Sequence, residues 1–260
     1  MAVLQILAVR YAVQPVILVP YALATRRSLT MSPRLFALTL LRTLLHMGAI
    51  WMMFTALIYL PLAEAIAIAY VEPFIMMLLG HYLLKEMVGS RRFIACVVGF
   101  IGVLLVVQPT FAAVGWPALL PVGVAIAFAF FLIVTRVIAK EADPVSLQAV
   151  SGMMACAIFA AAFLLLPSLE WMPVADGQWP LLIAVGIFGT FAHLAMTGAM
   201  RFAPAATLAP TQYLEIPFAT IIGWVIFSEF PNGLAGLGIA ITLASGLYIL
   251  HREHKAEQTP

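Results

Sequence analysis

Two glutamates lie near the middle of long apolar stretches, where a charge is unfavourable. Glu72 belongs to the stretch 61–86, PLAEAIAIAYVEPFIMMLLGHYLLKE, and Glu215 to the stretch 204–229, PAATLAPTQYLEIPFATIIGWVIFSE. A charged side chain at the centre of a membrane helix costs about 2.5–3.5 kcal/mol on insertion scales, so it is usually paired or functional. Carboxylates in such positions could bind a cationic group, a hydroxyl or a coupling proton.

The two stretches are copies of each other. Tyr70 and Tyr213 are 143 residues apart, and at this offset the stretches align without a gap. Chance supplies one or two matches in alanine-rich sequence, but hardly a matched Tyr-x-Glu together with a matched closing glutamate. Self-similarity at a fixed offset indicates an internal repeat. The matched pairs are Pro61 and Pro204, Ala63 and Ala206, Tyr70 and Tyr213, Glu72 and Glu215, Gly80 and Gly223, and Glu86 and Glu229.

Polar and aromatic neighbours accompany the glutamates. Tyr70 and Tyr213 each precede a glutamate by two residues, and Gln212 lies three residues before Glu215. Residues three or four apart share one face of a helix. We therefore expect both glutamates, Gln212 and the two tyrosines to line a substrate-binding cavity, with the tyrosines supplying aromatic contact.

A proline follows shortly after each glutamate. Pro73 and Pro217 each remove a backbone donor and free a carbonyl near the carboxylate. In membrane helices such positions act as kinks or present polar backbone to a cavity. The prolines predict a bend in each helix, which serves either packing or function.

Three further polar residues lie within apolar stretches: Arg10, Arg42 and His46. They form a second set of candidate substrate-binding residues, and His46 is also a candidate proton carrier. Alternatively, each glutamate pairs with a buried arginine and locks the repeats together, and this alternative stays open. His193 also lies within a span, but its counterpart in the repeat is Ile50, so symmetry does not support it.

The composition identifies the class of protein. Of the 260 residues, 64% are hydrophobic and 9% are charged, whereas soluble domains carry about 25% charged residues. The sequence therefore predicts an all-α polytopic membrane protein. A net charge of +2 without a basic tract gives no indication of nucleic acid binding. Cys96 and Cys156 lie in apolar runs, and no catalytic, phosphate-binding or metal-binding motif is present, so we expect no enzyme, no cofactor and no metal site.

The apolar stretches predict about nine transmembrane helices. A bilayer core of about 30 Å needs roughly 20 apolar residues of helix, and short connections leave no room for a soluble domain. The predicted spans are residues 4–25, 36–59, 62–84, 91–109, 117–138, 145–166, 180–201, 205–228 and 234–250.

The basic residues fall in alternate loops, which predicts the orientation in the membrane. The other loops between spans contain no Lys or Arg. The C-terminus is therefore expected in the cytoplasm. The basic residues of the expected cytoplasmic side are Arg26, Arg27, Arg34, Lys85, Arg91, Arg92, Arg136, Lys140, Arg201, Arg252 and Lys255.

The repeat also predicts the architecture. Subtracting 143 places the span 117–138 before the first residue, so each copy should contain five helices and the first copy lacks its opening one. Truncation of the start, or a nine-helix variant, would account for this. Five helices per copy place the copies in opposite orientations, an arrangement typical of secondary transporters. We divide the chain into a first repeat, 1–110, a second repeat, 116–250, and a cytoplasmic tail, 251–260.

Several segments resemble a known family. The helix ending in LLKE, the following SRRFIACVVGFIGVLLVVQP and its echo before GIAITLASGLYIL are similar to EamA-type transporters of the drug/metabolite transporter superfamily. The stretch RFAPAATLAPTQYLEIPFATIIGWVIFSE is similar to members named for S-adenosylmethionine uptake. The resemblance covers nearly the whole chain and implies ten helices, cytoplasmic termini and transport of amino acids, nucleotide-like metabolites, vitamins or drugs. The sequence departs from this pattern in its missing first helix.

These observations predict a secondary transporter that moves a small amphipathic or zwitterionic organic metabolite by alternating access. An amino acid derivative, an S-adenosylmethionine-like solute or a vitamin-like solute would fit. The expected partners are this substrate, the lipid bilayer of the cell (inner) membrane and, as an option, a second copy in a homodimer. The alternative is a non-transporting membrane helix bundle that acts as a scaffold or a lipid scramblase.

Overall fold

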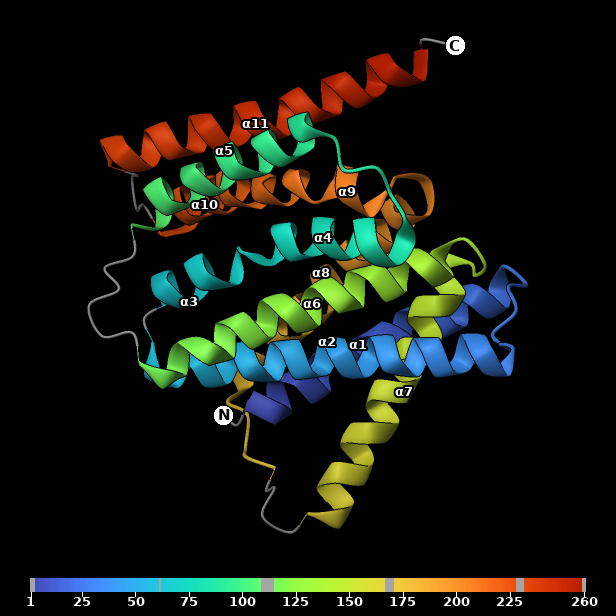
Figure 1. Ribbon diagram of the computed structural model, residues 1–260. Coiled ribbons are helices and arrows are strands. Elements are labelled where there is room, and N and C mark those ends of the chain that lie inside the picture. Colours follow the sequence, from blue (N-terminus) through green and yellow to red (C-terminus); the bar gives the residue numbers. More distant parts are fainter. Residues whose placement is uncertain (1–2, 61, 109–114, 167–170, 228–231, 259–260) are drawn as a thin grey trace. The chain divides into compact units, whose positions relative to one another are not determined.

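The computed structural model describes residues 3–60, 62–108, 115–166, 171–227 and 232–258, and the regular structure of these residues is helical (Figure 1). A bilayer offers no partner to backbone N–H and C=O groups, so an apolar chain satisfies them within helices. The elements are α1 (Val3–Ala24), α2 (Pro33–Tyr59), α3 (Leu62–Ala69), α4 (Glu72–Leu84), α5 (Ser90–Val107), η1 (Trp116–Ala118), α6 (Leu119–Ala139), α7 (Pro144–Leu165), η2 (Asp176–Gln178), α8 (Trp179–Phe202), α9 (Ala205–Leu208), η3 (Pro210–Leu214), α10 (Glu215–Phe227) and α11 (Gly233–Gln258).

Seven helical segments in the described part of the chain are long and apolar enough to cross a membrane, and they coincide with the first seven predicted spans. The all-helical prediction is thus confirmed. The eighth predicted span, 205–228, is interrupted between α9 and α10. The ninth corresponds to α11, whose apolar part is Gly233–Ile249. This helix continues to Gln258 and so includes residues 251–258 of the predicted tail.

The helix boundaries repeat at the same offset as the sequence. α4 and α10 each contain 13 residues and begin at Glu72 and Glu215, which are 143 residues apart. α5 begins at Ser90 and α11 at Gly233, again 143 residues apart. The two copies therefore share local structure as well as residues.

The chain forms two compact units, and each unit takes helices from both copies. Unit 1 comprises Met1–Trp51 and Val134–Phe202, and unit 2 comprises Met52–Ile133 and Ala203–Pro260. α2 and α6 each contribute one end to each unit. The units are therefore not the repeats.

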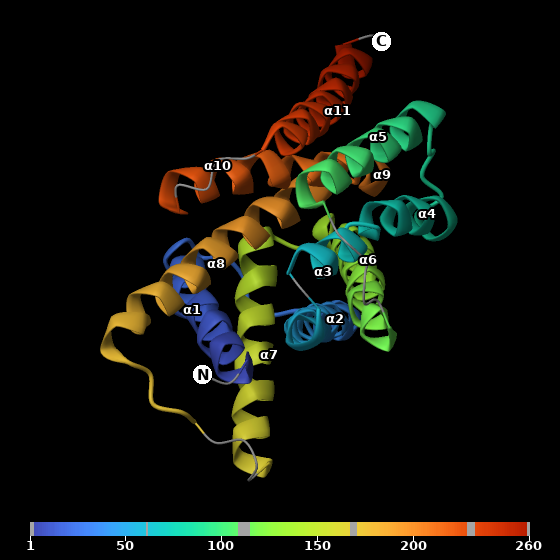
Figure 2. The ribbon, with the colours of Figure 1, turned by 90° about the vertical axis from the view of Figure 1, so that its left-hand side faces the viewer.

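In unit 1, α1 packs against α7 and α8 (Figure 2). The Tyr11 ring lies 5.8 Å from the Phe159 ring, and the Gln14 amide donates to the Gln148 carbonyl at 2.5 Å. As residue numbers rise along α1, the numbers of their partners on α7 fall. The two helices, which occupy equivalent positions in the two copies, are therefore antiparallel. At one end, an ion pair joins Arg27 to an acid that precedes α7, Asp143.

In unit 2, α5 packs along α11, and the two helices lie side by side in both views (Figures 1 and 2). The Ser245 hydroxyl donates to the Ala95 carbonyl at 2.6 Å, whereas Gln108 bonds Asn232 at 3.0 Å. These counterparts are therefore antiparallel as well. Small residues permit the close approach, as expected for helices in a membrane.

The crossing of α5 and α11 generates a stability prediction. A Cβ added at Gly238 would lie 2.5 Å from the Gly102 carbonyl oxygen, a backbone atom that cannot rotate away. Gly238→Ala should therefore lower the free energy of unfolding by about 1–3 kcal/mol. Thermal unfolding of the detergent-purified protein measures the loss. Gly236→Ala on the same helix is the matched control, because its Cβ would meet no atom within 4 Å. Equal melting temperatures for both variants would contradict the packing argument.

Candidate functional site

The predicted helix over 61–86 is interrupted at Tyr70 and Val71, between α3 and α4. Pro73 lies in the first turn of α4, where its missing amide hydrogen costs little. In an unbroken helix the Tyr70 carbonyl would accept from the Phe74 amide, but that amide bonds to Val71 instead. The Tyr70 carbonyl is therefore released from the helix.

The copy over 204–229 is interrupted at the corresponding place. α9 ends at Leu208, the 3-10 turn η3 follows, and α10 begins at Glu215. Pro217 lies in the first turn of α10, as Pro73 does in α4. Instead of the expected bend at each proline, both spans break just before the glutamate, and each proline starts the helix that follows.

Glu72 is buried at the first break, with 6% of its surface exposed. The Gln212 amide, from η3, lies 3.4 Å from the Glu72 Oε1 atom and 3.1 Å from the Met76 sulfur. Glu72 also opens α4, and the positive end of a helix dipole favours negative charge. An amide donor and a helix N-terminus thus face this carboxyl group.

The two tyrosines of the repeat meet each other. The Tyr213 hydroxyl donates to the released Tyr70 carbonyl at 3.2 Å, and the ring centroids are 5.9 Å apart. Gly99 leaves room for the Tyr213 ring, since a Cβ there would lie 2.4 Å from it. The Tyr70 side chain forms a hydrogen bond with Glu215, which is exposed at the start of α10.

The five residues ranked first from the sequence therefore form one cluster within unit 2. We call it the carboxylate centre; it consists of Tyr70, Glu72, Gln212, Tyr213 and Glu215. The sequence predicts that these five residues line one cavity. The structure adds contacts between the copies, because both breaks lie against each other.

Glu86 is a residue of this region that the sequence identified only as a repeat marker. Lys85 has φ 55°, and this left-handed turn directs Glu86 back toward the bundle. The Glu86 Oε2 atom accepts from the Ala206 amide at 3.1 Å, in the first turn of α9. Pro204 offers no side-chain cap to that turn, so the distant glutamate supplies one.

A second polar cluster lies in unit 1, where Arg42 is 2% exposed. Its Nε atom donates to Thr135 at 2.7 Å, and its Nη1 atom donates to Gln148 at 3.0 Å and to Ser151 at 2.9 Å. Its Nη2 atom donates to Thr197 at 3.3 Å. These acceptors are neutral, and they tie α2 to α6, α7 and α8.

Next to Arg42, two histidines lie between a tyrosine and another arginine. Tyr11 hydroxyl and His46 Nδ1 are 2.5 Å apart, and the His46 and His193 rings meet edge to face at 4.3 Å. Arg10 Nη2 lies 3.1 Å from His193 Nε2. Because a guanidinium only donates, Nε2 of His193 is the acceptor.

We call this group the arginine centre; it consists of Arg10, Tyr11, Arg42, His46 and His193. Three of its members were predicted, and Tyr11 and His193 were not. The repeat did not indicate a role for His193, because its counterpart in the first copy is Ile50. The spacing of His193 and Thr197 could have indicated this role. They lie four residues apart on one helix, as Arg42 and His46 do on α2.

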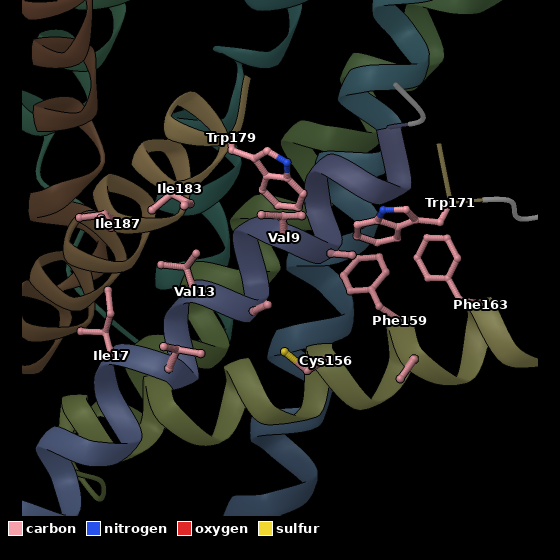
Figure 3. A pocket seen from close by; sticks show the side chains of 14 residues that line it. Val9, Val13, Ile17, Cys156, Phe159, Phe163, Trp171, Trp179, Ile183 and Ile187 are labelled. Carbon is pink, nitrogen blue, oxygen red and sulfur yellow. The ribbon is translucent and has the colours of Figure 1, made fainter. Parts of the chain in front are cut away.

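One described pocket shares no lining residue with the carboxylate centre. It has a volume of about 620 Å³ and lies in unit 1 between α1, α7 and α8 (Figure 3). Aliphatic and aromatic side chains line it, with Trp171 and Trp179 toward one end (Figure 3). Such a lining offers a polar solute few hydrogen-bond partners, so residue chemistry locates the candidate site better than pocket size does.

A polytopic helical fold in which interrupted spans bring polar residues together is typical of membrane transport proteins. Residues 1–108 and 115–250 match the model of the EamA-like transporter family. The chain belongs to this family.

Individual relatives agree with this membership. The chain is 30% identical over 251 residues to a riboflavin transporter of Vibrio cholerae, covering 95% of this chain and 82% of the relative. It is 24% identical to an S-adenosylmethionine uptake transporter of Rickettsia prowazekii, with the same shares. A solved crystal structure superposes with a TM-score of 0.80 at 18% identity, over 95% of this chain and 88% of the other, which shows the shared fold.

The family confirms the main functional predictions. The protein is a multi-pass membrane transporter of a small molecule and not an enzyme. The predicted resemblance to EamA-type transporters is confirmed, including similarity to S-adenosylmethionine transporters.

The hydrogen bond between the two breaks can be tested directly. Tyr213→Phe removes the donor to the released Tyr70 carbonyl and should lower the free energy of unfolding by about 1–3 kcal/mol. Thermal unfolding in detergent measures the change. Tyr82→Phe is the control, since Tyr82 is 70% exposed and its substitution should shift stability by about 0.5 kcal/mol at most. An unchanged melting temperature for Tyr213→Phe would show that the bond contributes nothing.

Proposed function

We propose that this transporter moves a small amphipathic or zwitterionic organic metabolite by alternating access, with the carboxylate centre as its substrate-binding site. The observation that carries the proposal is the meeting of the two interrupted spans, which bring Glu72 and Gln212 within 3.4 Å of each other. Interrupted helices with exposed backbone and polar side chains are how many secondary transporters build binding sites near the middle of the membrane.

The chemistry of the carboxylate centre favours a solute with a cationic or hydroxyl-bearing part. The two carboxyl groups accept hydrogen bonds or charge, and the Gln212 amide can donate to the solute in place of Glu72. Tyr70 and Tyr213 add aromatic surface at which a cation or a planar ring is stabilised. Relatives named for S-adenosylmethionine and for riboflavin support this range of solutes.

We further propose that the two copies, 1–110 and 116–250, are inverted repeats that supply nine spans. The antiparallel packing of α1 with α7 and of α5 with α11 supports this, since each pair consists of counterparts. Opposed copies of similar structure give a transporter two alternative states of similar energy, which alternating access requires. On this proposal, lipid covers the apolar side chains exposed around the bundle, and a homodimer would form through the same faces.

Flux into proteoliposomes tests the assignment of the carboxylate centre. Competition against a panel of amino acids, S-adenosylmethionine and riboflavin should identify a transported solute. Glu72→Gln or Glu215→Gln should then lower the uptake rate about tenfold or more, because a hydrogen bond to a charged group contributes about 1.5–3 kcal/mol. Melting temperatures should stay close to that of the wild type.

Glu141→Gln is the matched control, because Glu141 forms an exposed ion pair with Arg34 and its substitution should leave uptake unchanged. If no solute moves or competes, and both glutamate variants change only stability, the non-transporting helix bundle replaces our proposal. Movement of fluorescent lipid between leaflets would then identify a scramblase.

We propose that the protein lies in the inner membrane with a cytoplasmic C-terminus, because the basic residues gather in alternate loops. Fusions to the C-terminus check this. A fluorescent protein that matures only in the cytoplasm should be bright there, and alkaline phosphatase, which is active only outside, should be inactive. The reverse pattern would contradict the orientation.

A further inference from the structure

The apolar pocket of unit 1 lies along three helices, α1, α7 and α8, that are each long and apolar enough to cross a membrane (Figure 3). Its volume of about 620 Å³ is that of a ligand pocket, for which about 300–1,000 Å³ is usual. Some of its lining side chains are exposed, including Val16 at 71% and Ile183 at 44%. The pocket is therefore a groove that opens sideways from these helices rather than an enclosed cavity.

Small side chains leave the hollow. On α1 the groove is lined by Ala8 and Ala12, which are four residues apart and share one face of the helix. On α7, Cys156 and Ala160 have the same spacing. All 14 lining side chains are aliphatic or aromatic, apart from Cys156. The groove thus offers close packing to an apolar ligand and no counterion to a charged one.

The length of the groove matches the depth of one leaflet. On α8 its lining residues run from Trp179, the first residue of the helix, to Ile187, which is eight residues or about 12 Å further along the axis. On α1 they run over residues 8–17, which is about 14 Å. Half of a bilayer core of about 30 Å is about 15 Å. The groove therefore covers half of the membrane.

Tryptophans mark the end of the groove at the membrane surface. Trp179 begins α8, and Trp171 lies in the segment that precedes this helix (Figure 3). The Gln5 amide donates to the Met172 carbonyl at 2.7 Å, which places the start of α1 at the same end. Tryptophan is enriched where membrane meets water. The groove thus runs from the interface toward the middle of the membrane.

We propose that this groove binds one acyl chain of a membrane phospholipid. The headgroup lies beyond the two tryptophans, and the methyl end of the acyl chain lies near Cys156 and Ile187. Association within a bilayer depends on van der Waals packing, because lipid and protein are equally apolar there. A hollow lined by small side chains gives an acyl chain more contacts than a flat helix surface does.

The depth of the groove distinguishes a lipid from a second copy of the protein. A transmembrane helix of a second copy would contact its partner along a core of about 30 Å, whereas the groove covers about half of that length. On the proposed orientation the lipid belongs to the outer leaflet, because the loop before α8 contains no Lys or Arg. The groove lies within unit 1, so its occupancy does not depend on the carboxylate centre.

Native mass spectrometry of the whole protein, released from a mild detergent with added palmitoyl-oleoyl phosphatidylethanolamine, tests the proposal. The wild type should retain one phospholipid per chain. Ala160→Trp places a large ring in the groove and should lower the retained fraction about tenfold. Ala161→Trp is the matched control, because Ala161 is also exposed but does not line the groove, and it should retain lipid as the wild type does.

A phosphatidylethanolamine with a diazirine at the end of one acyl chain locates the bound lipid. After illumination in nanodiscs, the label should concentrate on the peptide that contains Cys156 in the wild type and in Ala161→Trp. It should be lost from this peptide in Ala160→Trp. Ile183→Trp and Leu181→Trp provide a second pair on α8, since both residues are exposed and only Ile183 lines the groove.

Melting temperatures without added lipid show whether each variant is folded, and the pair on α8 decides the question if Ala160→Trp does not fold. Lipid retention by folded groove variants equal to that of the wild type overturns the inference. Labelling spread evenly over the exposed apolar faces, which would indicate bilayer contact only, overturns it as well. Retained dimers that dissociate in the groove variants alone would identify a second copy as the occupant, which also contradicts it.

Discussion

The structure of unit 2 depends on the satisfaction of backbone groups at two interrupted spans. A bilayer supplies no water to a broken helix, so every carbonyl that leaves the helical ladder needs another donor. At the first break that donor is the Tyr213 hydroxyl, which reaches the Tyr70 carbonyl from the other copy. The contact fixes both breaks against each other, and the carboxylate centre exists because of it. The proposed substrate site and the contact that satisfies the freed backbone carbonyl are therefore the same structure.

The two polar centres meet the difficulty of buried charge in different ways. In unit 2, Glu72 lies at a helix N-terminus and faces an amide. In unit 1, Arg42 is surrounded by hydroxyls and a glutamine from three helices, α6, α7 and α8. Neutral acceptors can hold a guanidinium because it offers five donors in a fixed plane. Arg42 thus organises unit 1, because it joins α2 to α6, α7 and α8.

Glycine decides where these helices can meet. α5 and α11 cross where the backbone of Gly102 contacts the backbone of Gly238. Gly99, which also lies on α5, leaves room for the Tyr213 ring. A membrane offers little hydrophobic drive for helix association, so close packing has to supply it. Two glycines of α5 therefore have different roles: Gly102 lets α11 approach, and Gly99 leaves room for the tyrosine that joins the breaks. Packing and site are therefore coupled through one helix, α5.

The sequence by itself predicted the all-helical membrane class, the first seven spans and the five residues that meet in the carboxylate centre, because hydropathy and a 143-residue repeat can be recognised from the residues alone. Only the tertiary structure decided that the spans break before Glu72 and Glu215 rather than bend at the prolines, since the stabilising donor comes from the other copy. The tertiary structure also places His193 in the arginine centre, although the repeat gave no support for a role of this residue. A contact between residues 183 positions apart leaves no periodic trace in either helix, so folding alone reveals it.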